Sequence, residues 1–386
     1  RRQRQMCIRD RIKGSKNLNV PHLRFPEFSG EWKEEQLDSI ATLSKGIGIS
    51  KEQLSEDGEP CILYGELYTK YKSEIIKHVE SKTDIDSSKL KRSKANDVII
   101  PCSGETAVDI ATARCVPFDN ILLGGDLNVI SLHKYDGAFM SYQLNGKRKY
   151  DIARVAQGVS VVHLYGEHLK AIKTYNPSLP EQQKIAELLS LIDERIATQN
   201  KIIKKYESLI KGIAHRVAGM GKPNVRIAEC LECTSSTLQE SEVSEVGTYP
   251  VYGANGIVGY LDSYNTSDEA IYIVKDGSGV GSVAYVKGRC SATGTLNILT
   301  AQKDYSLQFL YYLLKVFNYD PYKTGMAIPH IYFKDYGKTK IFCPSYNVQL
   351  LYARMLVAID TKLLTEEKYL YRLNCQKQYL LRQMFI

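Results

Sequence analysis

The chain has 386 residues, of which 44% are hydrophobic and 24% are charged, a composition that allows two or three folded domains. No apolar run approaches the ~18 residues needed to span a membrane, and no apolar stretch follows the basic N-terminus as it would in a secretory signal. Nine cysteines without paired spacing favour a reducing compartment, the cytoplasm, over a disulfide-stapled secreted protein.

The net charge of +8 is concentrated at the N-terminus, because residues 1–20 contain seven Arg or Lys and one Asp. The run RRQRQMCIRDR resembles translated adapter sequence, so we expect residues 1–20 to be a basic tail that is non-native or disordered, with a native start near Asn17 or Asn19. The remaining chain is nearly neutral. Any DNA contact must therefore come from local patches rather than from overall charge.

Residues 21–176 are predicted to form a strand-rich, mixed domain. Short runs of Val and Ile bounded by Gly, Asp or Asn, such as Val98–Ile100 and Ile121–Leu123, are typical of strands. Two basic clusters are candidates for DNA phosphate contacts, although solvated loops would have the same composition. They comprise Lys89, Lys91, Arg92 and Lys94, and then Lys147, Arg148 and Lys149.

Residues 177–221 are predicted to form a long helix. Apolar residues recur at steps of three and four over about five heptads, which is typical of a coiled-coil seam. Pro180 suits the first helical turn, and Ser178 could cap it. The seam begins Ile185, Leu188, Ile192, Ile196, Gln199, Ile203 and Tyr206.

Residues 222–343 are predicted to form a second strand-rich domain, with strands at Ile271–Val274 and Leu296–Leu299 and a short helix at Leu307–Val316. The run Gly277–Gly281 lacks the remaining residues of a nucleotide-binding loop and predicts a tight turn. A loop containing Lys323, Thr324, Gly325 and His330 is a candidate for phosphate contact. Cys230 and Cys233 lack a second pair or a nearby histidine, so we expect no metal site.

Residues 344–386 are predicted to form a second long helix, which Asn347 could cap. Its seam begins Tyr352, Met355, Ile359, Leu363, Glu366, Leu370 and Leu373. Gln199 and Glu366 interrupt the two seams at the same point, where polar residues can fix the register of paired helices.

The two halves of the chain repeat each other. Between Pro177–Lys201 and Pro344–Lys368, nine positions match at a spacing of 167 residues. Upstream, Gly158, His163 and Tyr165 match Gly325, His330 and Tyr332 at the same spacing. Farther upstream, we pair Ser103-Gly104 and Cys115 with Ser278-Gly279 and Cys290, and Tyr64-Gly65 with Tyr252-Gly253. We take Tyr64, Gly65, Ser103, Gly104, Ser278 and Gly279 as further candidate DNA-binding positions.

The repeat predicts an α+β protein with two tandem mixed α/β domains, each followed by a long helix. The two helices would pair as an antiparallel coiled coil, and the whole would have pseudo-twofold symmetry. A helix of ~37 residues would be roughly 55 Å long. No catalytic motif is recognisable in the sequence.

This organisation resembles the specificity subunit of type I restriction–modification systems. The resemblance covers about residues 17–386 and is carried by NVPHLRFPEFSGEW near the start, YGELYTKY at 64–71, the helix entry PSLPEQQK and the terminal LLRQMFI. The second helix entry departs from this pattern, with Asn347-Val348-Gln349-Leu350 in place of Pro-Glu-Gln-Gln.

The resemblance implies that each domain is a target recognition domain that reads one half of a bipartite DNA site. The helices would set the spacing and dock two methyltransferase subunits, which restriction and translocase subunits would join in bacterial host defence. S-adenosylmethionine, ATP and Mg²⁺ would be bound by those partners and not by this chain. The alternative is a coiled-coil scaffold with two protein-binding modules.

Overall fold

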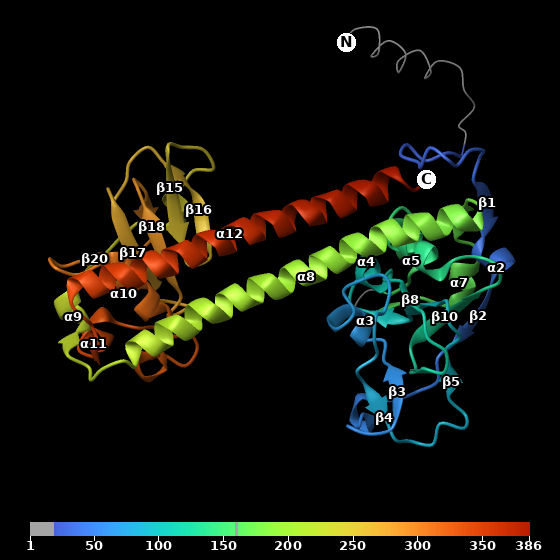
Figure 1. Cartoon of the computed structure of the whole chain (residues 1–386), viewed down its shortest axis with the longest axis horizontal. Helices are drawn as coiled ribbons and strands as arrows, with labels where there is room; N and C mark the ends of the chain where they lie inside the picture. Colours follow the sequence, from blue (N-terminus) through green and yellow to red (C-terminus); the bar gives the residue numbers. More distant parts are fainter. Residues whose placement is uncertain (1–18, 159–160) are drawn as a thin grey trace, which may run out of the picture. The chain divides into compact units, whose positions relative to one another are not determined.

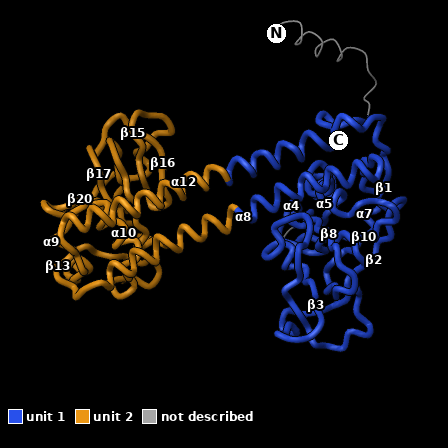
Figure 2. The backbone as a smooth tube through the Cα atoms, viewed as in Figure 1, with its two compact units in different colours: residues 1–198, 370–386 blue, residues 199–369 orange. Residues whose placement is uncertain are grey.

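The computed structural model describes residues 19–158 and 161–386 (Figure 1), so the predicted tail of residues 1–20 lies almost wholly outside the described residues. The chain forms two compact units (Figure 2). The first combines residues up to Thr198 with Leu370–Ile386, and the second comprises Gln199–Tyr369. Two helices, α8 (Leu179–Ala218, 40 residues) and α12 (Tyr346–Gln383, 38 residues), contribute to both units. The predicted boundaries at 177, 222 and 344 lie near the ends of these helices. The compact units are instead divided within the helices, because each unit includes the helical residues that pack against its domain.

The first unit is built on an antiparallel four-stranded sheet in the order β2-β10-β6-β8. Strand β6 is buried at all five residues, as its Val and Ile content favours. These strands are β2 (Ala41–Lys45), β6 (Asp97–Pro101), β8 (Arg114–Val116) and β10 (Leu127–Leu132). A smaller sheet has the order β4-β3-β9-β5, formed by β3 (Glu59–Ile62), β4 (Lys82–Thr83), β5 (Lys91–Arg92) and β9 (Leu122–Leu123). Two further pairs join β1 (Lys33–Gln36) to β12 (Lys173–Asn176) and β7 (Ser103–Gly104) to β11 (Val162–His163).

Short helices complete the first unit. The longest of them, α5, begins after Asp136, whose Oδ1 accepts a hydrogen bond of 2.7 Å from the backbone N–H of Phe139. These helices are α2 (Leu37–Ile40), α3 (Glu66–Thr69), α4 (Ala107–Ile110), α5 (Gly137–Asn145), α6 (Lys149–Val155), α7 (Gly166–Lys170) and the 3-10 turn η2 (Lys51–Gln53).

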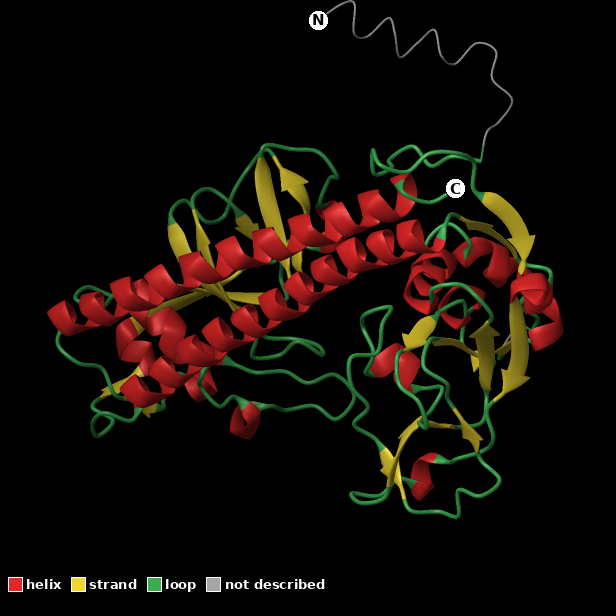
Figure 3. Cartoon of the chain, turned by 45° about the vertical axis from the view of Figure 1, so that its right-hand side comes forward, coloured by secondary structure: helices red, strands yellow, loops and turns green. Residues whose placement is uncertain are grey.

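The second unit repeats the main sheet in the order β14-β20-β17-β18, formed by β14 (Leu231–Ser235), β17 (Glu269–Val274), β18 (Val283–Lys287) and β20 (Leu296–Ala301). A three-stranded sheet contains β15 (Tyr249–Gly253), β16 (Gly256–Leu261) and β19 (Ser291–Ala292), and β13 (Val225–Arg226) pairs with β21 (Lys340–Ile341). The short helices are α9 (Ile227–Cys230), α10 (Leu307–Lys315), α11 (Phe333–Tyr336), η3 (Glu240–Glu242) and η4 (Asp320–Tyr322). Figure 3 shows the mixture of strands, helices and loops in each unit.

The common sheet order confirms the predicted duplication, but two upstream pairings were out of register. His163 lies opposite Ser103 in the β7–β11 ladder, whereas His330 lies opposite Asp276. The counterpart of Ser103 is therefore Asp276 and not Ser278. In the first unit Ile62 of β3 lies opposite Leu123 of the parallel strand β9, and in the second unit Tyr252 of β15 lies opposite Ala292 of the parallel strand β19. Tyr252 therefore corresponds to Ile62 and not to Tyr64.

The predicted match of Cys115 with Cys290 in the repeat was also wrong. Cys115 lies opposite Val98 in the edge strand β8, and the residue in that place in the second unit is Tyr285, opposite Ile271 in β18. Cys290 comes after β18 and precedes β19. Similar dipeptides in loops do not fix register, because register is set by ladder hydrogen bonds and by which face each side chain occupies.

The long helices pack against each other in opposite directions within each unit. In the first unit, Ile185 and Ile192 near the start of α8 share a core with Leu380 and Met384 near the end of α12. In the second unit, Val217 near the end of α8 shares a core with Ala353 near the start of α12. The predicted antiparallel pairing is thus present in both units.

Most of the predicted seam is removed from solvent. Buried members are Ile185, Ile192, Gln199, Ile203, Leu363 and Leu373, and half-buried members are Leu188, Ile196, Tyr206, Ile359, Glu366 and Leu370. Met355 was wrongly placed, since it is 39% exposed while Ala353 and Leu356 are buried. There the first turns of α12 turn Ala353 toward the core of the second unit, which shifts the buried face. Asn347 lies inside α12 and Ser345 precedes the helix, so Asn347 is not its cap.

Candidate functional site

A buried glutamine attaches each domain to its long helix. The Oε1 atom of Gln182 accepts a hydrogen bond of 2.9 Å from the backbone N–H of Asp136, and its Nε2 donates to the carbonyl of Pro177 at 2.8 Å. Gln349 does the same with the N–H of Ser306 and the carbonyl of Pro344, both at 2.9 Å. Asp136 and Ser306 cap α5 and α10. The same joint therefore holds a short domain helix against a long helix in both units.

A tyrosine–aspartate hydrogen bond repeats beside this joint. The Tyr142 hydroxyl donates to Oδ2 of Asp193 at 2.7 Å, and the Tyr312 hydroxyl donates to Oδ2 of Asp360 at 3.2 Å. Burial raises the pKa of both tyrosines well above the usual range, with a further contribution from each aspartate. Both hydroxyls are therefore protonated donors at neutral pH.

Only the first unit adds a buried cluster of charges at this place. The Nζ atom of Lys377 lies 2.6 Å from Oε2 of Glu74 and 2.6 Å from Oδ1 of Asp193, and the three side chains are between 6% and 11% exposed. Burial lowers the pKa of Lys377, but the two carboxylates outweigh it and hold the pKa above its usual value. The residue that corresponds to Lys377 in the second unit, 167 positions earlier, is Ile210.

The ends of one loop are joined by the same backbone hydrogen bonds in both units. Backbone hydrogen bonds join Gln157 to His163 at 2.7 and 2.9 Å, and Thr324 to His330 at 2.7 and 2.9 Å. Gly158 and Gly325 begin these loops with φ of +116° and +89°, and a Cβ at either would approach a backbone carbonyl oxygen within 2.3 Å. Glycine is required at both positions, which explains why this pair survives in the repeat.

The groups around the two loops differ. The Nδ1 atom of His163 lies 3.3 Å from the Ser103 hydroxyl, whereas Nδ1 of His330 lies 2.6 Å from a carboxylate oxygen of Asp276. In the second unit the exposed part of the loop carries Met326 and Ile328. The scaffold is therefore common to both units, while the chemistry presented at the loops is particular to each.

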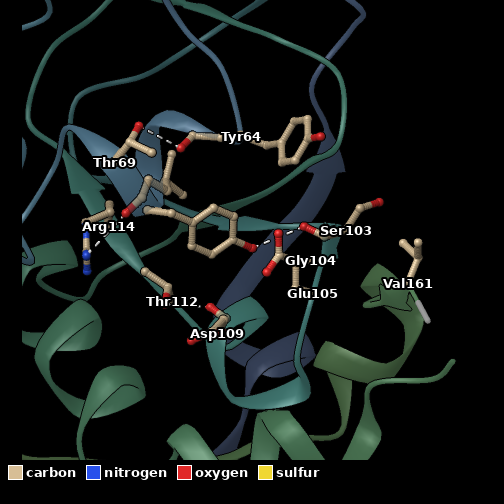
Figure 4. Close-up of a pocket in the computed structure, with 12 residues that line it drawn as sticks. Tyr64, Thr69, Ser103, Gly104, Glu105, Asp109, Thr112, Arg114 and Val161 are labelled. Carbon is tan, nitrogen blue, oxygen red and sulfur yellow. Dashed lines mark hydrogen bonds between the residues drawn. The ribbon is translucent and has the colours of Figure 1, made fainter. Parts of the chain in front are cut away.

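In the first unit, a cavity of about 690 Å³ brings together four of the predicted residues: Tyr64, Gly65, Ser103 and Gly104. Figure 4 shows Tyr64, Ser103 and Gly104 around it. Tyr68, which also lines the cavity, belongs to the YGELYTKY motif, whereas no motif or repeated position pointed to the lining residues Glu105, Asp109 and Val161. The Tyr68 hydroxyl donates to the carbonyl of Ser103 at 3.1 Å, which ties α3 to β7. The cavity thus combines aromatic rings, a serine hydroxyl and two carboxylates that can accept hydrogen bonds.

In the second unit, the predicted loop residues also come together. The N–H of Gly277 donates to the carbonyl of Pro329 at 3.0 Å, so the turn carrying Ser278 and Gly279 packs against the loop carrying Thr324, Gly325 and His330. Gly277 and Gly281 both have positive φ, as the predicted tight turn requires. Lys323 lies beside this loop, with its Nζ 2.7 Å from Oδ1 of Asp320.

Two arginines from the predicted basic clusters are engaged within the protein. Arg92 donates to both carboxylate oxygens of Glu59 at 2.6 and 3.0 Å, and this hydrogen bonding lowers the pKa of Glu59 to about 2. Arg148 donates to the carbonyl of Ile386 at 3.0 Å, lies 3.2 Å from Asp151 and stacks on the ring of Tyr175. Neither guanidinium is free for a phosphate in this conformation. Within the described residues, the lysines of these clusters form no ion pair: Lys89, Lys91, Lys94, Lys147 and Lys149.

Across residues 19–158 and 161–386, no group of three or more His, Cys, Asp or Glu side chains is placed to hold a metal ion. None of the helices in that part of the chain is both long and apolar enough to cross a membrane. Cys230 and Cys233 are both free cysteines, the first buried and the second half-buried.

Residues 29–208 and 224–373 match the model of the type I restriction modification DNA specificity domain, and these matches cover most of the chain. The chain therefore belongs to this family and contains two copies of its domain.

Individual relatives agree with this assignment. A putative type I specificity subunit from Mycoplasma genitalium is 24% identical over 283 residues, which cover 67% of this chain and 73% of that protein. The EcoprrI specificity subunit from Escherichia coli is 27% identical over 113 residues, which cover 29% of this chain and 28% of that protein.

Solved structures show the same fold. The crystal structure of a type I restriction–modification S subunit from M. genitalium superposes with a TM-score of 0.67 at 20% identity, covering 95% of this chain and 99% of that one. A chain from a study of complex assembly and conformational transition in the type I system gives a TM-score of 0.53 at 15% identity, again covering 95% and 99%.

Proposed function

We propose that each unit reads one half of a bipartite DNA target and that the two half-site sequences differ. One observation carries this proposal. The joints at Gln182 and Gln349 repeat nearly atom for atom, whereas the residues presented around the hairpin loops differ. Two domains that recognise different DNA sequences need the same attachment to the helices and different residues in their DNA-contacting loops.

The reading surface of the first unit is the cavity that Tyr64, Ser103 and Glu105 line. Carboxylates accept hydrogen bonds from the amino group of cytosine, and serine hydroxyls both donate and accept at base edges. In the second unit, Met326, Ile328 and the neighbouring Thr324 provide apolar and hydroxyl contacts, which suit a thymine methyl group and its surroundings.

Phosphate contacts fall to lysines and not to the two engaged arginines. Lys89, Lys94, Lys147 and Lys149, which form no ion pair within the described residues, would position the first unit on the DNA backbone. In the second unit Lys323 would have to exchange its ion pair with Asp320 for a phosphate. Arg92 and Arg148 instead hold the segments that carry these lysines. This division follows from the ion pair of Arg92 with Glu59 and the contact of Arg148 with Ile386.

The long helices would set the length of the unread spacer between half-sites and dock two methyltransferase subunits, which restriction and translocase subunits would join. The chain itself would be non-catalytic and would act in the bacterial cytoplasm. S-adenosylmethionine, ATP and Mg²⁺ would be bound by its partners. This assignment is supported by the family membership and by the solved structure reported for assembly of a type I system.

The test is to reconstitute the chain with its host's methyltransferase subunit and to map methylated bases in DNA. Glu105→Gln should change the preferred bases in one half-site, and Met326→Ala with Ile328→Ala should change the other. A charge-neutral exchange elsewhere, Glu245→Gln, is the matched control. Duplex affinity should also fall linearly on a log–log plot against salt. If wild-type complexes show no salt dependence and no bipartite methylation, the chain is a protein scaffold and not a DNA reader.

A further inference from the structure

A segment of the first unit occupies a place that is empty in the second. Residues Glu74–Ile76 run along the outer edge of β8, where the N–H of Cys115 donates to the carbonyl of Glu74 at 2.8 Å and the N–H of Ile76 donates to the carbonyl of Cys115 at 3.0 Å. The edge of the main sheet is thereby covered by one extended stretch of the chain.

The side chains of this segment fill the space between the sheet and the long helices. The Ser73 hydroxyl donates to Asp193 at 3.0 Å, Glu74 pairs with Lys377, and Ile75 packs against the apolar core that α8 and α12 form there. Asp193 consequently receives three partners, Tyr142, Ser73 and Lys377.

The second unit has the same surroundings without the segment. Tyr285 in β18 corresponds to Cys115, and among the described residues no strand or bridge adds to the outer edge of β18. A cavity of about 390 Å³ lies between α8, α10 and α12, with Asp360 and Ile210 in its wall. Within the described residues, Asp360 has one polar partner, Tyr312 at 3.2 Å, because Ile210 replaces the lysine of the first unit.

The cavity selects a basic occupant. Its wall contains three carboxylates, those of Glu207, Asp360 and Glu367, against two ammonium groups, and one of these, Lys315, lies over the ring of Tyr311. In the first unit Lys377 of the chain itself forms the ion pair with the corresponding aspartate, Asp193. In the second unit neither ammonium group of the wall forms an ion pair with Asp360 among the described residues, so a cation from outside would complete the same arrangement.

We propose that this cavity and the open edge of β18 together bind an extended segment of the methyltransferase subunit that carries a Lys or Arg side chain. The segment adds to β18 as Glu74–Ile76 adds to β8, and its cation pairs with Asp360. Strand addition supplies main-chain hydrogen bonds, and a pocket beside the edge supplies specificity. The inference rests on the proposed function, because that function brings the methyltransferase to these helices.

The experiment measures binding of the host's methyltransferase subunit to the full chain by sedimentation and calorimetry. Asp360→Asn removes the charge without changing the shape, and Ile210→Lys supplies the cation from within. Each should weaken one of the two methyltransferase copies roughly tenfold or more, because the charge-assisted hydrogen bond to the cation of the segment is lost. Glu245→Gln, an exposed exchange in the same unit, should leave both copies bound as in the wild type.

Amide hydrogen exchange provides an independent readout that needs no variant. Val283–Lys287 should become protected when the methyltransferase binds, whereas Arg114–Val116, already covered by the chain itself, should not change. Two copies that bind Asp360→Asn as tightly as wild type, with no added protection in β18, would overturn this inference alone. Failure of the wild-type chain to bind any methyltransferase would instead overturn the proposed function. If Ile210→Lys unfolds, Asp360→Asn and the exchange data still decide.

Discussion

Gln199 donates a hydrogen bond of 2.6 Å from Nε2 to Oε2 of Glu366, the residue that stands 167 positions later in the repeat. A residue that meets its own repeat counterpart lies on the local twofold axis of an antiparallel helix pair. Gln199 also donates to the backbone carbonyl of Glu366 at 3.1 Å. A helix shifted by one turn would lose both bonds, so this pair fixes the register.

Replacing Gln199 with leucine should therefore destabilise the second unit modestly. We expect the free energy of unfolding to fall by about 1 kcal/mol, because Glu366 loses its donor inside the seam but keeps its ion pair with Lys362. Thermal melts followed by circular dichroism measure the change. The double variant Gln199→Leu, Glu366→Leu should recover or exceed wild-type stability, and Thr198→Leu, at an exposed neighbour, should be nearly neutral. A double variant less stable than either single one would contradict this assignment.

Lys377→Met should have a much larger effect on the first unit. Removing the cation leaves Glu74 and Asp193 buried side by side, and breaking a buried ion pair in this way costs about 3–5 kcal/mol. Trp32 is the single tryptophan of the chain and lies in the same unit, so its fluorescence in urea follows this loss directly.

The matched control is Lys368→Met, at an exposed position of the same helix, which should leave the tryptophan transition unchanged. The triple change of Glu74, Asp193 and Lys377 to Gln, Asn and Met should recover part of the loss, since no charge is then left unpaired. Equal transitions for Lys377→Met and Lys368→Met would show that the cluster contributes nothing to stability.

In the second basic cluster, we expect Lys147 and Lys149 to contribute to DNA binding and Arg148 to contribute to stability. Lys147→Ala with Lys149→Ala should weaken DNA binding of the reconstituted complex uniformly across sequences and reduce the magnitude of the log K against log [salt] slope by about 2, as loss of two phosphate contacts does. Arg148→Ala should instead lower the midpoint of the tryptophan transition, because Arg148 ties Ile386 to the first unit. A change of base preference at one half-site in the lysine variant would mean that these lysines read bases.

The repeat predicted the architecture of two domains, each followed by a long helix, because its clearest matches fall on residues that make equivalent contacts in both units. Gln182/Gln349 and Asp193/Asp360 are two of the nine matched positions; the glutamines form the joint between domain and helix, and the aspartates form the tyrosine–aspartate bonds beside it. Their task was not predictable, since their partners lie on α5 and α10, more than 40 residues away in the chain. Periodicity also gave the seam, but it misplaced Met355 where α12 turns toward the core of the second unit.

The candidate site was less predictable for a related reason. Residues such as Glu105 and Asp109 differ between the two halves, so a search for repeated positions passes over them. Arg92 and Arg148 were selected by charge alone, and only the structure shows that Glu59 and Ile386 already engage them. Local composition identifies charges, whereas pairing depends on tertiary contacts.

The role of the helices in spacing gives the last prediction. Deleting Ile196–Ile202 from α8 together with its counterpart Leu363–Tyr369 from α12 removes one heptad from each helix and takes Gln199 and Glu366 out together, so the remaining seams still match. Each helix becomes roughly 10 Å shorter at 1.5 Å per residue. Because base pairs are spaced about 3.4 Å apart, the unread spacer of the methylated target should shorten by about three base pairs while both half-sites keep their sequence. Deleting the same heptad from α8 alone is the control, since mismatched seams should abolish assembly and not change the spacing. Mapped methylation with an unchanged spacer, or with altered half-sites, would show that the helices do not set the distance.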